Sequence, residues 1–345
     1  MSTPEADLDL AAVVRFADGR VPGLTEQMQV SKFSTGQSNP TFLLRGAEDS
    51  FVLRRKPLGT LLKSAHAVER EFRVQQALQG TDVPVPEMFL LCEDASILGA
   101  PFYIMSHVEG RNFDDPRLGD LPLGSRSKVM EEMCRVLAAL HSVDVEAVGL
   151  ADYGPPGDYF DRQLARWSAQ YEASRTDNLP EMDALIQGLG DALPEDDGQR
   201  TLVHGDYRLD NLIFSPDRHS CRAVLDWELS TLGHPYADLA GVIMQWQMPP
   251  GAEGRGLSGV DRAAEGLLQD QAFVDLYCSL RGSTPIKNFG FYLAFSFFRM
   301  GAILQGVKKR ALDGNASNPE HGLRLGQHVP RFARAGLAAL SGEAT

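Results

Sequence analysis

The sequence feature that most constrains this chain is a pair of polar motifs separated by a short strand-forming segment. Residues 203–211 read VHGDYRLDN, and residues 223–228 read AVLDWE. Asp206 and Asn211 lie five residues apart across a predicted loop, and Asp226 follows an apolar strand. Oxygen-bearing side chains that converge from a loop and from a strand end suit a hard cation such as Mg²⁺. One carboxylate can stay free to orient a hydroxyl nucleophile, and phosphoryl transfer needs that combination.

Length and composition are typical of a globular protein with two domains or one large bilobal domain. The chain has 345 residues, of which 43% are hydrophobic and 23% are charged. Its net charge of −13 argues against a general attraction to nucleic acid or anionic membranes. Residues 1–10 lack a secretory signal, and the apolar stretch 289–304 contains Arg299 and is too short to span a bilayer. We therefore expect a cytoplasmic protein with neither a nucleic-acid nor a membrane partner.

The periodicity of apolar residues predicts an α+β chain in two lobes. Strand patterns dominate the first hundred residues, with one helical pattern at 64–78, whereas helical patterns dominate after Gly110. We predict a small antiparallel-sheet lobe at 1–105, a link at 106–110 and a larger helical lobe at 111–345. Ligand sites favour the cleft between two such lobes.

The motifs at 203–211 and 223–228 resemble those of the aminoglycoside phosphotransferase and choline-kinase-like family, which has a protein-kinase-like fold. The catalytic loop of that family reads HGDxxxxN, and an aspartate follows where protein kinases have Asp-Phe-Gly. The resemblance implies that Asp206 is the catalytic base and that Asn211 and Asp226 bind Mg²⁺, with ATP as the phosphoryl donor. Arg208, near this base, is a further candidate catalytic residue that either binds a carboxylate or phosphate of the substrate or pairs with Asp226.

Two other polar residues near this loop are expected to be structural. His204 stands between Val203 and Gly205, and we interpret it as a buried hydrogen-bonding residue rather than a metal ligand. Asp238 matches a family position that opens a helix. Its expected role is to hold the catalytic loop through backbone N–H groups.

The first lobe contains a match to the family's nucleotide site, in the expected order. The polar turn 34–39 corresponds to the phosphate-covering turn, where small residues let backbone N–H groups approach phosphate oxygens. Its candidate nucleotide-binding residues are Gly36, Gln37, Ser38 and Asn39. In the link, the resemblance implies that the Ser106 carbonyl and the Val108 N–H read the adenine.

The cation that holds the nucleotide phosphates departs from the kinase pattern. Arg54 stands at the end of the third strand, where kinases have a lysine, and Lys56 lies on the same face by strand alternation. We predict that Arg54 binds the phosphates, with Lys56 as the alternative. Glu71 is the predicted partner of this cation on the following helix, and Glu69 is its alternative.

A longer resemblance, from about 33 to 247, points to one branch of this superfamily. Segments 36–41, 54–57, 149–154 and 226–233 look like the phosphotransferase domains found with, or fused to, acyl-CoA dehydrogenases. The resemblance implies a 4-hydroxyacyl-CoA as acceptor and a functional association with an acyl-CoA dehydrogenase. Candidate residues for lining the acceptor pocket are Tyr207, Arg208, Trp227 and Trp246. The aromatic ones could equally be core residues, which is the preferred interpretation for Trp246. We interpret the basic run 308–310 as a solvated helix end, with a contact to CoA phosphates as the alternative.

We therefore interpret the sequence as an ATP- and Mg²⁺-dependent kinase that phosphorylates a hydroxyl of a small molecule. An aminoglycoside, choline or sugar acceptor is an alternative on the same fold. A catalytically silent, nucleotide-binding pseudokinase module is another, and a metal-dependent hydrolase that uses His204, Asp206 and Asp226 is a third. The choice between ATP and GTP and the oligomeric state stay open.

Overall fold

The computed structural model describes residues 8–33, 39–58, 67–216, 219–251, 254–316 and 318–342. The chain divides into two compact units. The first, here called the sheet unit, comprises Met1–Phe113, Val143–Ala151 and Arg208–Ser230. The second, the helical unit, comprises Asp114–Ser142, Asp152–Tyr207 and Thr231–Thr345. The predicted lobes at 1–105 and 111–345 stay a prediction, because this division assigns two later segments of the chain to the sheet unit.

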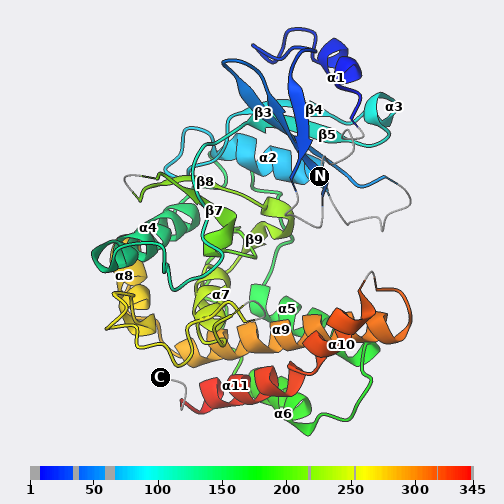
Figure 1. Cartoon of the computed structure of the whole chain (residues 1–345). Coiled ribbons are helices and arrows are strands. Elements are labelled where there is room, and N and C mark those ends of the chain that lie inside the picture. The colour runs from blue at the N-terminus through cyan, green and yellow to red at the C-terminus, as the bar shows by residue number, and fades with distance from the viewer. Residues whose placement is uncertain are drawn as a thin grey trace. The chain divides into compact units, whose positions relative to one another are not determined.

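The sheet unit is built on five antiparallel strands in the order β1-β2-β3-β5-β4 (Figure 1). The central strand, β3, pairs with both β2 and β5, so that Arg54 lies opposite Thr41 on one side and Tyr103 on the other. Successive side chains of β3 point to opposite faces of the sheet. Val52 and Arg54 therefore share one face. The strands are β1 (Gln29–Lys32), β2 (Thr41–Arg45), β3 (Ser50–Arg55), β4 (Met88–Cys92) and β5 (Phe102–Ser106).

Each face of this sheet is covered by apolar side chains from a different helix. Val13 and Ala17 of α1 (Leu10–Ala17) pack with the side chains of one face, near the short α3 (Ala95–Leu98). Val68 and Phe72 of α2 (Val68–Leu78) pack with the other face. The face that carries Arg54 is therefore the α2 face, as the alternation in β3 requires.

A two-stranded hairpin, β7 (Leu212–Phe214) and β8 (Cys221–Val224), completes the sheet unit. The Val224 N–H donates to the Pro84 carbonyl at 2.9 Å, and residue 111 forms a β-bridge with Phe214. Short 3-10 turns precede and follow the hairpin, at η1 (Leu209–Asn211) and η2 (Trp227–Leu229). The second turn contacts α2.

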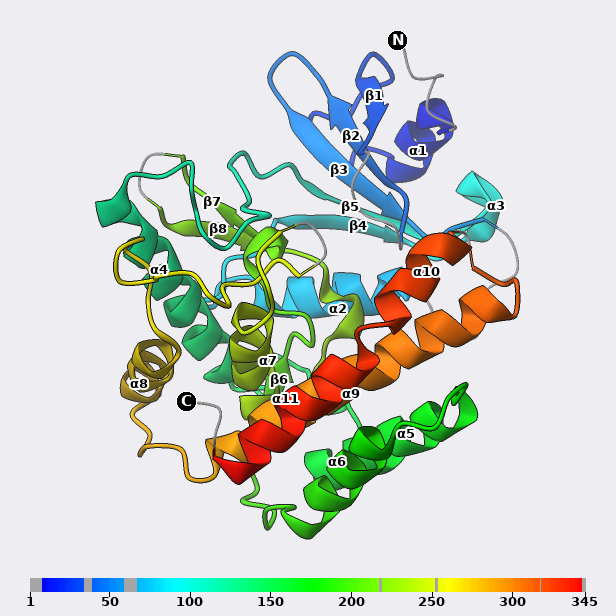
Figure 2. The same cartoon turned by 60° about the horizontal axis from the view of Figure 1, so that its bottom comes forward.

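The helical unit is organised around the long helix α9, which contacts five other helices (Figure 2). A two-stranded sheet, in which Val203 of β6 pairs with Thr231 of β9, leads directly into the loop that contains Asp206. The elements are α4 (Leu123–His141), α5 (Tyr159–Ala173), α6 (Pro180–Asp191), β6 (Thr201–Val203), β9 (Thr231–Gly233), α7 (Tyr236–Trp246), α8 (Asp270–Arg281), α9 (Phe289–Leu312), α10 (Pro319–Gly326) and α11 (Val329–Ser341).

The helix α9 is long and apolar enough to cross a membrane by length and composition alone, with a mean hydropathy of 1.2 over its most apolar window. However, 67% of that window is buried inside the protein. The expectation that the apolar stretch at 289–304 is too short to span a bilayer is wrong for the helix as a whole, because it continues to Leu312. Its burial is that of a core helix.

Replacing Gly110 by alanine should destabilise the sheet unit. A Cβ atom at this position would lie 2.4 Å from Ile213 Cγ2 and 2.5 Å from the Phe214 carbonyl oxygen. We expect a loss of about 1–3 kcal/mol, the usual effect of overpacking, in urea-induced unfolding. Gly119→Ala is the control, because a Cβ there has no neighbour within 4 Å among the described residues. Equal stabilities of the two variants would contradict the prediction.

Candidate active site

The β7–β8 hairpin places Asn211 and Asp226 at the same end of the sheet unit. Leu212 pairs with Val224, and the Leu225 N–H donates to the Asn211 carbonyl at 2.8 Å. Asp226 then adopts a left-handed conformation, with φ 65° and ψ 59°, where the chain turns into η2. Non-glycine residues adopt this conformation infrequently, and aspartate is one of the few that tolerate it. The Asp226 side chain is 35% exposed.

Arg54 connects this hairpin to helix α2 within the sheet unit. Its Nη2 donates to Asp226 Oδ1 at 2.7 Å, and its Nε lies 2.9 Å from Glu71 Oε2. The Arg54 side chain is 13% exposed and that of Glu71 is 1% exposed. Burial alone would lower the pKa of Arg54, but the nearby negative charges, above all Glu71, raise it beyond its usual range. The guanidinium is therefore a permanent positive charge between two carboxylates.

Glu71 is fixed by three partners in addition to its position on α2. Asn39 Nδ2 donates to Oε1 at 2.7 Å, and the Tyr103 hydroxyl donates to Oε2 at 3.1 Å. Burial raises the pKa of Glu71 to about 7, although the charge of Arg54 opposes this rise. The four side chains form one buried network, and Asn39, predicted at the phosphate turn, holds Glu71 in it.

The structure distinguishes the two cation–glutamate pairings that the sequence left open. Lys56 Nζ lies 2.8 Å from Glu69 Oε1, nearer the surface, and this pair does not contact Asp226 or Glu71 in the described part of the chain. Arg54 alone of the two cations contacts both Glu71 and Asp226. The geometry therefore matches the predicted pairing of Arg54 with Glu71. Whether this cation binds phosphate stays a prediction.

The loop with Asp206 belongs to the helical unit and is held by a buried carboxylate. Asp238, near the start of α7, accepts the His204 N–H at 2.6 Å and the Gly205 N–H at 2.8 Å. His141 Nε2 lies 3.3 Å from the same carboxylate. Burial would raise the pKa of Asp238, but its contacts, beginning with the His141 hydrogen bond, lower it. Asp238 thus has the loop-holding contacts that the sequence interpretation gave it.

His204 has the contacts of a structural residue. It is fully buried, and its Nδ1 accepts the Asp206 N–H at 3.3 Å. Its ring packs edge-on against Tyr207, whose hydroxyl donates to the Met133 carbonyl at 2.8 Å. These contacts fix the backbone on both sides of Asp206.

The other predicted nucleotide-binding and catalytic residues differ in whether the structure describes them and in what they contact. Gly36, Gln37 and Ser38 lie outside the described residues. The Val108 N–H has no acceptor among the described residues, as a group that reads adenine requires, and Ser106 donates its N–H to the Glu87 carbonyl at 2.8 Å. Arg208 pairs with Asp210 at 3.0 Å, a partner that the sequence interpretation did not consider.

The aromatic candidates for an acceptor pocket are buried core residues. Tyr207, Trp227 and Trp246 are between 1% and 3% exposed, and the Trp227 Nε1–H donates to the Val224 carbonyl at 2.9 Å. The sequence interpretation missed Arg299 of α9, which donates to the Gly205 carbonyl at 3.1 Å, next to Asp206. Only the position of Arg299 within an otherwise apolar stretch signalled a special role.

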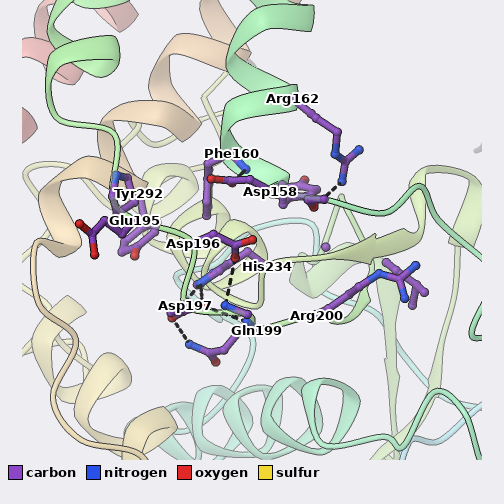
Figure 3. A pocket seen from close by; sticks show the side chains of 16 residues that line it. Asp158, Phe160, Arg162, Glu195, Asp196, Asp197, Gln199, Arg200, His234 and Tyr292 are labelled. Atoms are coloured by element: carbon purple, nitrogen blue, oxygen red, sulfur yellow. Dashed lines mark hydrogen bonds and ion pairs between the residues drawn. The ribbon is translucent and has the colours of Figure 1, made fainter.

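A small pocket of about 110 Å³ lies in the helical unit, outside the predicted site (Figure 3). His234 lies in it with Nε2 3.3 Å from Asp197 Oδ1, and Tyr292 stacks on the imidazole ring. Burial lowers the pKa of His234, so the neutral imidazole is favoured. This pair attaches the loop at 194–200 to the start of α7, which is a structural function.

The family model for phosphotransferase enzymes matches residues 29–276, which include the hairpin, the Asp206 loop and strands β1 to β5. The chain belongs to the phosphotransferase enzyme family.

Relatives and solved structures support this membership. The chain is 48% identical, over 85% of its length, to acyl-CoA dehydrogenase family member 10 of Mus musculus. It spans 28% of the mouse protein, and less than half of the other first curated relatives that it matches. A protein of Ralstonia eutropha provisionally assigned as an aminoglycoside phosphotransferase is 43% identical, with a TM-score of 0.89 over 97% of this chain and 98% of that one.

A more distant structure confirms the predicted fold class. A thermostable mutant of aminoglycoside phosphotransferase APH(4)-Ia, in complex with AMP-PNP and hygromycin B, is 17% identical with a TM-score of 0.60, over 94% of this chain and 99% of that one. At this identity the similarity shows a shared fold. This phosphotransferase therefore has the α+β, kinase-like fold that the motifs predicted.

Replacing Asp238 by alanine should destabilise this phosphotransferase strongly, because two buried N–H groups lose their acceptor. We expect a loss of about 3–5 kcal/mol in the free energy of unfolding, measured with urea. Asp238→Asn is the control and should lose less, since its amide oxygen can still accept one N–H. Because folding lowers the pKa of Asp238, its contribution to the free energy of unfolding is fully present above the ordinary aspartate pKa of 3.8. This contribution is lost as the pH falls below that value. An alanine variant as stable as the wild type at pH 7 would contradict this role.

Proposed function

We propose that this phosphotransferase transfers the γ-phosphoryl group of ATP, in the presence of Mg²⁺, to the hydroxyl of a hydroxyacyl-CoA, with a 4-hydroxyacyl-CoA as the leading candidate. The observation that carries the proposal is the position of Arg54 between Glu71 and Asp226. A cation that a helix glutamate holds next to a metal-binding aspartate is the arrangement that protein kinases require.

The nucleotide side of the proposal rests on groups of the sheet unit. The Arg54 guanidinium has five N–H donors in a planar fork, so it can hold Glu71 and still donate to phosphate oxygens. Val108 supplies an N–H with no acceptor among the described residues, which suits an adenine nitrogen.

Asp226 and Asn211 have the donor chemistry that Mg²⁺ prefers. The Asp226 carboxylate is one-third exposed, and the hairpin brings Asn211 to the same end of the unit. Mg²⁺ is usually held by one or two protein ligands, with waters and phosphate oxygens at the other positions. When bound there, the ion would neutralise charge on the phosphate oxygens.

Asp206 is the proposed general base. His204 and Asp238 fix the backbone around it, and Arg299 holds the Gly205 carbonyl. A carboxylate on so constrained a loop can accept the proton of an acceptor hydroxyl with little rearrangement. General bases of this kind typically contribute two to four orders of magnitude to the rate.

The acyl-CoA acceptor is supported by the names of the relatives. They are acyl-CoA dehydrogenase family members, of which this chain spans only part. An enzyme that phosphorylates a hydroxyacyl-CoA would act on a CoA thioester, as acyl-CoA dehydrogenases do, so we also propose a functional association with such a dehydrogenase. The hygromycin B complex of a relative in fold makes an aminoglycoside the main competing acceptor.

The decisive experiment measures ADP release by the purified chain with MgATP and a panel of acceptors. We expect stimulation by 4-hydroxyacyl-CoA, and a kcat lower by roughly two to four orders of magnitude in Asp206→Asn, with ATP binding retained. The conservative change keeps the size of the side chain and removes its basicity. Asp210→Asn, which alters the neighbouring carboxylate, is the matched control.

Other outcomes separate the alternatives. Stimulation by an aminoglycoside or by choline would keep the mechanism and overturn the acyl-CoA acceptor. MgATP binding without turnover on any acceptor would favour a silent nucleotide-binding module. Full activity of Asp206→Asn would remove Asp206 from the role of base.

Arg54→Gln and Lys56→Gln test which cation serves the nucleotide. Because Arg54 alone contacts both Glu71 and Asp226, its loss should raise the KM for ATP at least tenfold, as expected for a charged hydrogen bond to phosphate. Lys56→Gln should change this KM less than threefold. Steady-state kinetics at saturating acceptor measure both. The reverse order would assign the phosphates to Lys56.

A further inference from the structure

Two helices of the helical unit each place an arginine over the same indole ring, that of Trp167. Arg166 of α5 lies with its guanidinium carbon 5.5 Å from the centroid of Trp167, and Arg299 of α9 lies 5.7 Å from the same ring. Arg162 is four residues before Arg166 and therefore lies on the same face of α5. We call Arg162, Arg166 and Arg299 the arginine cluster.

None of these three arginines forms an ion pair with a carboxylate among the described residues. Arg162 donates only to backbone carbonyls, those of Pro155 and Gly157, at 3.4 Å, and its Nε is buried without a hydrogen-bond partner in the described part of the chain. Arg299 donates to a carbonyl as well. In a chain with a net charge of −13, three unneutralised arginines in one place are unexpected.

Other basic side chains of the same unit are neutralised. In the run at 308–310, which the sequence suggested as a contact for CoA phosphates, Lys308 pairs with Asp177 and Lys309 with Asp313. Asp158, the N-cap residue of α5, accepts the Phe160 N–H at 2.9 Å and forms no ion pair with the cluster in the described part of the chain. The cluster therefore carries positive charge that a ligand can neutralise.

Tyr159, the first residue of α5, lies close to the cluster. Burial raises the pKa of its hydroxyl; the charges of Arg299, Arg162 and Arg166 oppose this rise, and the charge of Asp238 adds to it. Its ring packs against Gly233 of β9, where a Cβ would lie 2.6 Å from the ring. Since β9 pairs with β6, the strand before the Asp206 loop, Tyr159 and the cluster are fixed near that loop.

Arg299 connects the cluster to the proposed catalytic base. It donates to the Gly205 carbonyl at 3.1 Å, and Asp206 is the next residue. A ligand held by the arginine cluster would therefore lie on the same unit as the base. Any ligand of the cluster is thus placed to be part of the acceptor.

The charge of the cluster specifies the chemistry of its ligand. Like charges four residues apart on a helix repel each other, and a bound dianion would remove that repulsion. Guanidinium groups also match the oxygens of a phosphate with paired N–H donors. A phosphate group satisfies both conditions better than a neutral sugar or a cationic aminoglycoside, which the cluster would repel.

We propose that Arg162, Arg166 and Arg299 form a binding site for a phosphate or diphosphate group of the acceptor. The inference rests on the proposed function for its description of the ligand as the acceptor. It adds that arginines of α5 and α9 recognise the phosphates of the acceptor, the part of it remote from the reacting hydroxyl.

A binding experiment tests the site without any turnover. Isothermal titration of the full chain, saturated with MgADP to fill the nucleotide site, uses coenzyme A, inorganic pyrophosphate and pantetheine, which has no phosphate. We expect coenzyme A to bind and pantetheine to bind at least tenfold more weakly. Arg162→Gln/Arg166→Gln should bind coenzyme A roughly ten- to a hundredfold more weakly, as for the loss of one or two charged hydrogen bonds.

The matched control is Lys287→Gln/Arg331→Gln. Both residues are exposed, and neither forms an ion pair with a carboxylate in the described part of the chain, so this variant removes the same number of charges from another surface of the unit. We expect it to bind coenzyme A as the wild type does. A loss equal to that of Arg162→Gln/Arg166→Gln would reduce the effect to net charge and overturn the site.

A kinetic experiment links the site to the acceptor. Arg162→Gln/Arg166→Gln should raise the KM for a 4-hydroxyacyl-CoA at least tenfold, while the KM for ATP and the KM for the corresponding pantetheine thioester stay within twofold. An equal rise for both thioesters would overturn phosphate recognition by the cluster.

The two experiments distinguish a failure of the proposed function from a failure of the arginine cluster as a phosphate site. If no acceptor stimulates ADP release, the proposed function fails, and the titration still decides whether the cluster binds a phosphate. If pyrophosphate binds and coenzyme A does not, the site takes free phosphates and its role in acceptor binding is wrong. If neither binds to the wild type, the site itself is wrong.

Discussion

The sheet unit depends on one buried ionic arrangement, in which Arg54 lies between Glu71 and Asp226. The Arg54 guanidinium pairs with two carboxylates, so these three side chains together can carry more negative than positive charge. A divalent cation can offset this excess. Asn39 and Tyr103 satisfy the remaining oxygens of Glu71, which a buried carboxylate requires. A lysine has a single nitrogen and is less suited to two partners in fixed directions. An arginine at this position, where kinases have a lysine, therefore fits its two carboxylate partners.

The helical unit holds its loop through hydrogen bonds to the loop backbone. The Asp238 carboxylate accepts two consecutive N–H groups, and the His204 ring accepts the N–H of Asp206. These contacts fix the backbone on the N-terminal side of Asp206. The same loop is supported from α9 by Arg299, which also belongs to the arginine cluster.

The sequence predicted those structural features that depend on strand alternation and on the spacing of residues within a motif. Strand alternation placed Arg54 on the α2 face, and the hairpin predicted between the two motifs brings Asn211 close to Asp226. That Asp206 joins them in one site stays a prediction. The role of Asn39 in holding Glu71 and the pairing of Arg208 with Asp210 were not predictable, because they depend on side-chain contacts that leave no periodic signal. The arginine cluster was missed for a related reason: α5 and α9 are far apart in sequence, and only their packing brings Trp167 between Arg166 and Arg299. The sequence left open whether the aromatic candidates line a pocket or belong to the core, because large rings are common in both, and the structure buries all three.

The chain passes from the helical unit to the sheet unit between Tyr207 and Arg208, inside the motif at 203–211. Tyr207 is anchored to Met133 in the helical unit, and the Asn211 carbonyl is anchored to Leu225 in the sheet unit. Consecutive Cα atoms are about 3.8 Å apart, so the peptide from Asp206 to Asn211 is a short tether of at most roughly 19 Å. The length of this segment therefore sets an upper limit on the separation of Asp206, which belongs to the helical unit, from Asn211, which belongs to the sheet unit.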